Sequence, residues 1–273
     1  MIAPSDVRRL QPQSATPAGE GTTPAAATTA TGKRTILLPD IDWVTIPGGE
    51  FVYQQGERRK LPAFRIARYP VTNLQYQTFS DAGGYRDERW WRELIRPEPV
   101  PSRWPQANRP RTNVDWYEAV AFCRWLSAQF AYEVRLPTED EWERAARGVD
   151  GWQYSWGKAY ESGRANIDET ARYGGDRVGD WFLDQTTAVG VYPHGTSREG
   201  VLDLSGNVWE WCVNKSDHPD QIQADTSGDS RVLRGGSWND DAGLARGSRR
   251  RRGRPGDRNS GPGFRLVSSA PIP

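Results

Sequence analysis

Arginine is the functional side chain that stands out in this sequence of 273 residues. Lysine occurs only four times among the 36 basic residues, so nearly all of the positive charge is guanidinium. Ten arginines lie between residues 231 and 265, where only three aspartates oppose them, although the formal net charge of the whole chain is +1. A guanidinium binds carboxylates and phosphates through paired hydrogen bonds and stacks on aromatic rings. This segment therefore predicts a surface that recognises an anionic ligand.

Cysteine and histidine are too scarce to build a metal centre or a disulfide scaffold. The chain has two cysteines, Cys123 and Cys212, and two histidines, His194 and His218. These numbers exclude a zinc ribbon and a histidine-rich metal site. Cys123 continues the apolar stripe of a predicted helix, which favours a core residue over a nucleophile. Large aromatic side chains dominate protein cores, so we expect core packing, not a sugar-binding platform, for three tryptophans: Trp209, Trp211 and Trp238.

The N-terminal part of the chain has the composition of a disordered tail. Between residues 11 and 32, 19 of 22 residues are Pro, Ala, Thr, Ser or Gly, and such a stretch buries too little apolar surface to offset its conformational entropy. We expect a tail over residues 1–35 and one folded domain over residues 36–273. The absence of a secretory signal and the few cysteines predict a cytoplasmic protein. No apolar run reaches the ~20 residues of a membrane span, so we expect no membrane partner.

Three helices and several short strands are predicted to follow the tail. Residues 41–51 form a strand that a Pro-Gly-Gly turn interrupts, and residues 64–66 form another. The first helix begins at Thr72 or Asn73 and ends at the glycines 83–84. The other two helices begin with capping-box patterns, in which an acidic residue follows the cap by three positions: Asp115 with Glu118, and Thr138 with Glu141.

A stretch of 24 residues near the C-terminus, 239–262, shows neither helical nor strand periodicity. It lies between two predicted strands, residues 231–238 and 263–267, and four consecutive arginines stand at its centre, residues 249–252. Loops longer than about 15 residues in compact domains are usually functional or disordered. The strands would hold both ends of the stretch, which favours a function.

The order of several short motifs resembles one known family. The motifs are IPGGEF at 46–51, YPVTNLQY at 69–76, RLPTEDEWERAARG at 135–148, DLSGNVWEW at 203–211, RGGSW at 234–238 and GFR at 263–265. Together they resemble formylglycine-generating enzymes, whose domain is a type of C-type lectin fold, over roughly residues 41–268. The resemblance implies an α+β domain that is rich in loops, with short strands and two or three helices.

The catalytic part of that family pattern is missing from the sequence. Formylglycine-generating enzymes carry two cysteines after the GGSW-like motif, and the matching residues here are Asp240 and Ala245. A carboxylate and a methyl group cannot replace two thiolates on Cu(I). Ergothioneine-type relatives use an iron-binding histidine cluster in an extra domain, which two isolated histidines cannot supply. We therefore expect a protein that is not an enzyme, and a divergent oxidase of the formylglycine-generating type is the alternative.

A second resemblance concerns the stretch from RGGSW to GFR, which is similar to the variable region of diversity-generating retroelement variable proteins. In that group, error-prone copying at template adenines converts asparagine codons into codons for many other residues. The resemblance implies fixed scaffold residues at Arg246, Arg250, Pro255, Arg258, Gly263, Phe264 and Arg265. It implies variable, ligand-binding residues at Asn239, Asp240, Asp241, Leu244, Arg249, Arg251, Arg252, Gly253, Asp257, Ser260 and Gly261.

The same resemblance to formylglycine-generating enzymes implies structural calcium, whose hard oxygen ligands match carboxylates and carbonyls. One site would use Asp203, Gly206, Val208 and Glu210. A second, less secure site would use Asn166, Ile167 and Asp180. Another interpretation is that Asp203 starts a turn and that Glu210 pairs with an arginine. Bound calcium would brace loops and would perform no chemistry.

The sequence thus predicts a receptor-like protein that displays a diversified surface to a protein or another macromolecular ligand. Nucleic-acid binding by the arginine-rich stretch is an alternative. The rest of the chain is net negative and has no second basic stripe, whereas binding to phosphates normally requires distributed cations. The oligomeric state is not predicted.

Overall fold

Three α-helices begin at the predicted capping residues in the computed structural model, which describes residues 38–269. The N-caps are Thr72, Asp115 and Thr138, and each forms a complete capping box with the side chain three residues later. These contacts satisfy backbone N–H groups that a helix start leaves without partners. The helices are α1 (Asn73–Asp81), α2 (Trp116–Phe130) and α3 (Glu139–Arg147), and two short 3-10 helices accompany them, η1 (Glu88–Trp91) and η2 (Pro193–Gly195).

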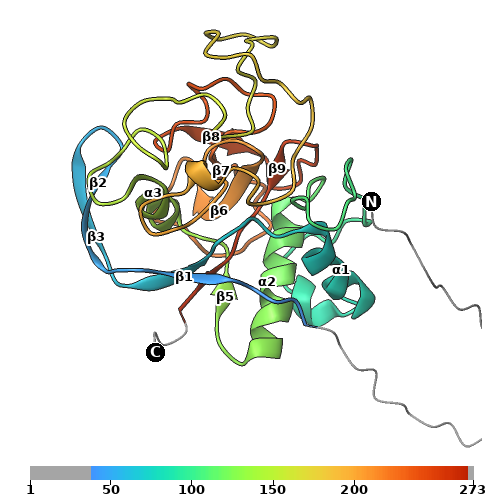
Figure 1. Cartoon of the computed structure of the whole chain (residues 1–273). Helices are drawn as coiled ribbons and strands as arrows, with labels where there is room; N and C mark the ends of the chain where they lie inside the picture. The colour runs from blue at the N-terminus through green and yellow to red at the C-terminus, as the bar shows by residue number, and fades with distance from the viewer. Residues whose placement is uncertain (1–37, 270–273) are drawn as a thin grey trace, which may run out of the picture. The chain divides into compact units, whose positions relative to one another are not determined.

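The strands form two four-stranded sheets and one hairpin (Figure 1). One sheet has the order β1 (Trp43–Ile46), β4 (Phe64–Ala67), β10 (Val267–Ser268) and β5 (Val134–Arg135). The hairpin consists of β2 (Gly49–Tyr53) and β3 (Glu57–Leu61). The other sheet has the order β8 (Arg250–Gly253), β7 (Arg231–Arg234), β6 (Trp209–Lys215) and β9 (Pro262–Gly263). This arrangement confirms the predicted α+β class.

Several predicted strands divide where the chain passes from one sheet to another. The strand expected over residues 41–51 is two strands, β1 and β2, which lie in different sheets. The strand expected over residues 263–267 is also two, because Phe264, Arg265 and Leu266 cross between β9 and β10 as buried residues. β7 ends at Arg234, four residues before its predicted end.

The arginine-rich stretch contains a strand, which corrects the expectation of irregular structure. β8 (Arg250–Gly253) pairs antiparallel with β7, from Arg231 opposite Gly253 to Arg234 opposite Arg250. β8 lies at the edge of its sheet, and its three arginines are exposed. An edge strand with exposed arginines shows no alternation of apolar and polar residues, so its sequence lacks the usual strand signal.

The core is aromatic and joins the helices to both sheets. Phe79, Phe122 and Trp125 pack edge to face or tilted between α1 and α2, with ring centroids 5.7–6.0 Å apart. Trp209, Trp211 and Trp238 are at most 5% exposed, which confirms that they belong to the core. Cys123 and Cys212 are buried free thiols, and desolvation raises the pKa of both. Neither cysteine is therefore a reactive thiolate.

The predicted tail and the predicted lack of a secretory signal concern residues outside the described range. Within residues 38–269, no helix combines the length and the apolar composition needed to span a bilayer.

Candidate ligand-binding surface

A buried ion pair holds the C-terminal end of the candidate segment. The Arg265 guanidinium donates to Glu210 from Nε at 2.6 Å and from Nη2 at 2.7 Å, and both side chains are fully buried. The same guanidinium donates to four backbone carbonyls, those of Ala67, Arg68, Leu202 and Asp203. Arg265 therefore ties together β4, the loop before β6, and β6 itself. The prediction that Arg265 is a scaffold residue agrees with these contacts.

A second set of ion pairs fixes β7 and β8 against α3. Arg234 is fully buried and donates to Glu143 Oε2 at 2.5 Å and to the Gly247 carbonyl at 2.7 Å. Arg250 Nε donates at 2.6 Å to Glu139, which is 1% exposed. Because Glu139 is desolvated, Arg250 has a structural role although it is itself exposed.

The neighbours of Arg250 present their guanidinium groups to solvent. Arg249, Arg251 and Arg252 are all exposed. Arg252 forms an ion pair with the exposed Asp217 and donates to Ser216 Oγ at 2.9 Å. Arg251 lies over the Trp209 ring at 5.6 Å from its centroid. Within the described residues, no carboxylate lies within 4.0 Å of the guanidinium of Arg249 or Arg251, so both are available to an anion.

Four of the predicted variable residues do not present a free side chain, which corrects the expectation of one exposed set. The Asp240 carboxylate accepts hydrogen bonds from Trp209 Nε1 at 2.8 Å and from the Ser237 backbone N–H at 2.9 Å. The Asp241 carboxylate accepts from the Leu244 N–H at 2.9 Å, and Leu244 packs against the core. Gly253 is buried, and a Cβ there would lie 2.6 Å from Trp211.

The remaining predicted variable residues lie at the surface or near it. Asp257 is exposed in a turn and accepts from the Arg254 N–H at 3.2 Å. Asn239, Ser260 and Gly261 are half-buried. Trp238 Nε1 donates to the Ser260 carbonyl at 3.1 Å, which brings the two ends of the segment together. The exposed arginines of β8 and this junction are the two parts of the candidate surface.

An aromatic row beside that junction was missed by the sequence analysis. Trp104 packs edge to face on Trp238 at 5.2 Å, Phe182 stacks on Trp238 at 6.4 Å, and Tyr173 packs edge to face on Phe182 at 5.6 Å. Exposed arginines flank the row, with Arg103 4.8 Å from the Trp104 ring and Arg172 5.7 Å from the Phe182 ring. Aromatic and arginine side chains together are typical of binding surfaces. The row comes from three loops that are distant in sequence, so no local pattern reveals it.

A cavity of about 410 Å³ adjoins the first half of the segment. Its lining carries both charges, with the basic Lys158 and Arg246 and the acidic Asp176 and Asp241. Asp240 and Ala245, which replace the two cysteines of the resembled oxidases, lie beside this lining in sequence, and Ala245 is fully buried. The lining contains no thiol.

The residues of the predicted downstream calcium site do not fit a cation as arranged. Glu210 gives both carboxylate oxygens to Arg265, and one of them also accepts from Trp142 Nε1 at 2.6 Å. Asp203 Oδ2 accepts from the Gly190 N–H at 2.7 Å. The Gly206 carbonyl accepts from the Val208 N–H at 2.9 Å. A guanidinium thus neutralises the carboxylate that calcium would need.

The predicted upstream calcium residues diverge in their exposure. Asn166 and Ile167 are 2% exposed, and Asn166 Oδ1 has no hydrogen-bond partner within the part of the chain that the structure describes. Asp180 has an 82% exposed side chain and pairs with Arg177. The free amide oxygen fits an oxygen-liganded cation, but the carboxylate points to solvent. Calcium here stays a prediction, and an unchanged melting temperature after chelation would contradict it.

Arg258 lies against an acidic pair at the start of α2. Its Nε is 3.6 Å from Asp115 Oδ2 and 3.8 Å from Glu118 Oε2, and Nη1 donates to the Glu98 carbonyl at 2.6 Å. Burial, reinforced by the Glu118 charge, raises the pKa of Asp115 to about 7. Burial also raises the pKa of Glu118.

Acidification is expected to stabilise the domain through Asp115. Because its folded pKa exceeds the ordinary value of 3.8, the folded state binds the proton first. This contribution is largest below pH 4 and is lost as the pH rises to 7, with a slope of up to about 1.4 kcal/mol per pH unit. Asp115→Asn keeps an N-cap side chain and removes the titration. Urea unfolding between pH 4 and 8 should show a flatter profile for the variant, and identical slopes would contradict this assignment.

Comparison with known proteins finds both enzymes and an inactive homologue. Hercynine oxygenase of Mycolicibacterium thermoresistibile is 34% identical over 76% of this chain and 51% of its own length. Inactive C-alpha-formylglycine-generating enzyme 2 of Mus musculus is 31% identical over 84% of this chain and 86% of its own length. The chain therefore spans about half the length of the hercynine oxygenases that it matches.

One solved structure confirms the predicted fold. Treponema denticola variable protein 1 superposes with a TM-score of 0.61 at 22% identity, over 86% of this chain and 97% of the other. At this identity the similarity establishes the fold.

The prediction that the protein is not an enzyme is wrong. It rested on the missing thiols at Asp240 and Ala245, but relatives named as hercynine oxygenases are 31–34% identical to this chain. Their similarity points to enzymatic activity in the family. The absence of the two cysteines excludes catalysis by Cu(I) bound to two thiolates at this position. It does not exclude catalysis of another kind.

The family model described as the sulfatase-modifying factor enzyme 1-like domain matches residues 29–270, which is most of the chain. The capping boxes, the buried Arg265–Glu210 pair and the passage of the GFR residues between the sheets all lie within that match. The chain belongs to the sulfatase-modifying factor enzyme 1-like domain family.

Proposed function

We propose that this domain is a ligand-binding scaffold that displays residues 239–261 to a protein or another macromolecular ligand. The fold shared with a variable protein supports a scaffold of this kind. In the proposal, the contact residues are three exposed arginines, Arg249, Arg251 and Arg252, together with the junction at Asn239 and Ser260. The scaffold residues Arg250 and Arg265 would hold the segment in place and would not contact the ligand.

The observation that carries the proposal is the contrast among consecutive arginines. Arg249, Arg250 and Arg251 are all exposed, but only Arg250 forms an ion pair, with the buried Glu139, among the described residues. A guanidinium that has no structural partner can change its contacts without loss of stability. A displayed recognition surface requires that the residues that support folding differ from those that contact the ligand, and consecutive residues of this segment differ in that way.

The ligand surface in this proposal is acidic. Arg252 already forms an ion pair with Asp217, so a ligand carboxylate would replace a contact that the surface itself makes. Ion pairs at exposed positions weaken as salt screens them. The more accessible members of the aromatic row, Trp104, Phe182 and Tyr173, would supply the apolar part of the contact, and the buried Trp238 would support them.

Fluorescence anisotropy with three probes tests the proposal. The probes are a fluorescein-labelled glutamate-rich peptide, a glutamine-rich peptide of the same length, and a duplex DNA. We expect the acidic peptide to bind more tightly than the glutamine peptide and to weaken as salt rises. Equal binding of the two peptides, or an affinity that salt does not change, would contradict an acidic ligand. Duplex binding that exceeds peptide binding would favour the nucleic-acid alternative.

A further inference from the structure

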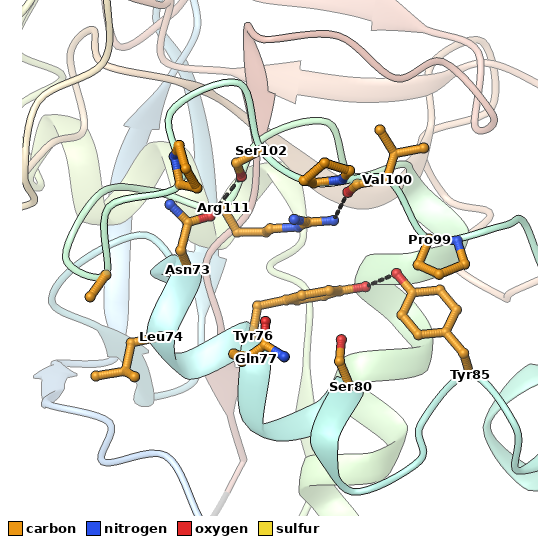
Figure 2. A pocket seen from close by; sticks show the side chains of 13 residues that line it. Asn73, Leu74, Tyr76, Gln77, Ser80, Tyr85, Pro99, Val100, Ser102 and Arg111 are labelled. Carbon is orange, nitrogen blue, oxygen red and sulfur yellow. Dashed lines mark hydrogen bonds between the residues drawn. The ribbon is translucent and has the colours of Figure 1, made fainter.

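A cavity of about 460 Å³ lies far along the chain from the variable segment, between α1 and the loop 99–107 (Figure 2). Tyr76 and Gln77 of α1 line one side, and Pro99, Val100 and Pro105 line the other. Figure 2 shows Arg111 extended across the cavity above the Tyr76 ring. The volume lies within the range of small-molecule sites, about 300–1,000 Å³.

Arg111 has no carboxylate in direct contact, and the charge of the buried Glu118 acts on it only from a longer distance. The residue is 8% exposed, and its guanidinium stacks 4.6 Å from the centroid of the Tyr76 ring. One terminal nitrogen, Nη2, donates to the Val100 carbonyl, whereas Nε is buried with no hydrogen-bond partner. Within residues 38–269, no carboxylate lies within 4.0 Å of this guanidinium. Buried cations normally have an anionic partner in contact, so this guanidinium can bind an anion that enters the cavity.

Apart from the Ser80 hydroxyl, the other polar side chains of the lining have hydrogen-bond partners among the described residues. The Asn73 amide donates to the Trp104 and Gln106 carbonyls at 2.9 Å and accepts from Ser102 Oγ at 2.6 Å. The Tyr76 and Tyr85 hydroxyls lie 2.8 Å apart, and Tyr85 donates to Glu118. This network holds the wall in place. A ligand with a negatively charged group would therefore bind to the Arg111 guanidinium.

We propose that this cavity binds a small organic carboxylate with an apolar body. The planar fork of a guanidinium matches a carboxylate, and its single charge matches a monoanion. Proline, valine and leucine side chains in the lining would contact the apolar body, and the Tyr76 ring holds the guanidinium in place. The site shares no residue with the proposed display segment, so either proposal can fail without the other.

Isothermal titration of the full chain with 4-phenylbutyrate and with its uncharged amide, 4-phenylbutyramide, tests this site. We expect the carboxylate to bind about tenfold more tightly than the amide, because a charge-assisted contact is lost in the amide. Gln77→Trp, which fills the cavity from α1, should abolish binding of both. Gln55→Trp, between β2 and β3, makes the same substitution at an exposed position outside the lining and should bind like the native chain.

Replacement of the cation distinguishes a ligand role from a structural one. Arg111→Met keeps apolar bulk over Tyr76 and should remove the preference for the carboxylate, so that acid and amide bind alike. Its melting temperature should change little, because the removal of a buried charge and the loss of the hydrogen bond to Val100 have opposite effects. The proposal is overturned if the native chain binds acid and amide equally, if neither binds, or if Gln77→Trp leaves binding unchanged. These three outcomes remain decisive even if Arg111→Met does not fold.

Discussion

Glu210→Gln is expected to lower the free energy of unfolding by about 3–5 kcal/mol, the usual cost when one partner of a buried ion pair is removed. Both Glu210 and Arg265 are fully buried, and the guanidinium would keep only neutral acceptors. Because Arg265 also binds carbonyls from β4 and the loop before β6, its rearrangement would loosen both sheets. Urea denaturation measures the effect.

Asp87→Asn provides the matched control, because Asp87 forms an ion pair with Arg89, whose side chain is 75% exposed. Exposed pairs contribute at most ~1 kcal/mol. If Glu210→Gln unfolds at the same urea concentration as Asp87→Asn, the Arg265–Glu210 pair does not contribute the expected free energy of unfolding.

Gly253→Asn is expected to destabilise the domain by roughly 1–3 kcal/mol, the range for overpacking a core. A Cβ at this position would lie 2.6 Å from Trp211 and 2.8 Å from Leu233, both of which are buried. Asparagine is the residue that a diversified position would most simply carry, so the variant tests directly whether residue 253 tolerates diversification.

Arg251→Asn on the same strand is the control, and its free energy of unfolding should stay within ~0.5 kcal/mol of the native value because its side chain is exposed. Thermal melting of the two variants compares the positions. Equal melting temperatures would mean that the packing around Gly253 relaxes readily, and residue 253 would return to the displayed set.

The sequence predicted those parts of the fold that depend on neighbours in the chain. Capping at Thr72, Asp115 and Thr138 involves residues three positions apart, and all three helix starts are confirmed. The α+β class and the C-type lectin type of fold followed from motifs in a fixed order, which the family match and the superposition confirm. Residue types and spacing were sufficient for these features.

The missed features depend on contacts between distant residues. Gly253 appeared replaceable because the Trp211 ring that excludes a side chain lies 42 positions earlier in the chain. The aromatic row joins Trp104, Phe182 and Trp238, which no periodicity connects. The exclusion of catalysis failed for a different reason, because residues 240 and 245 report on one chemistry while the family includes enzymes.

The most direct test of the display surface is the affinity of Arg249→Ala/Arg251→Ala for the glutamate-rich peptide, measured by anisotropy at fixed ionic strength. The matched control is Arg58→Ala/Arg92→Ala, which removes the same charge from two exposed positions outside the segment. We expect the first variant to bind at least about tenfold more weakly than the native chain, because contacts to charged groups contribute about 1.5–3 kcal/mol each. The control should bind within about twofold of the native chain, since it loses only long-range attraction. Equal losses in the two variants would show that net charge alone attracts the peptide, and this result would contradict a recognition surface on residues 239–261.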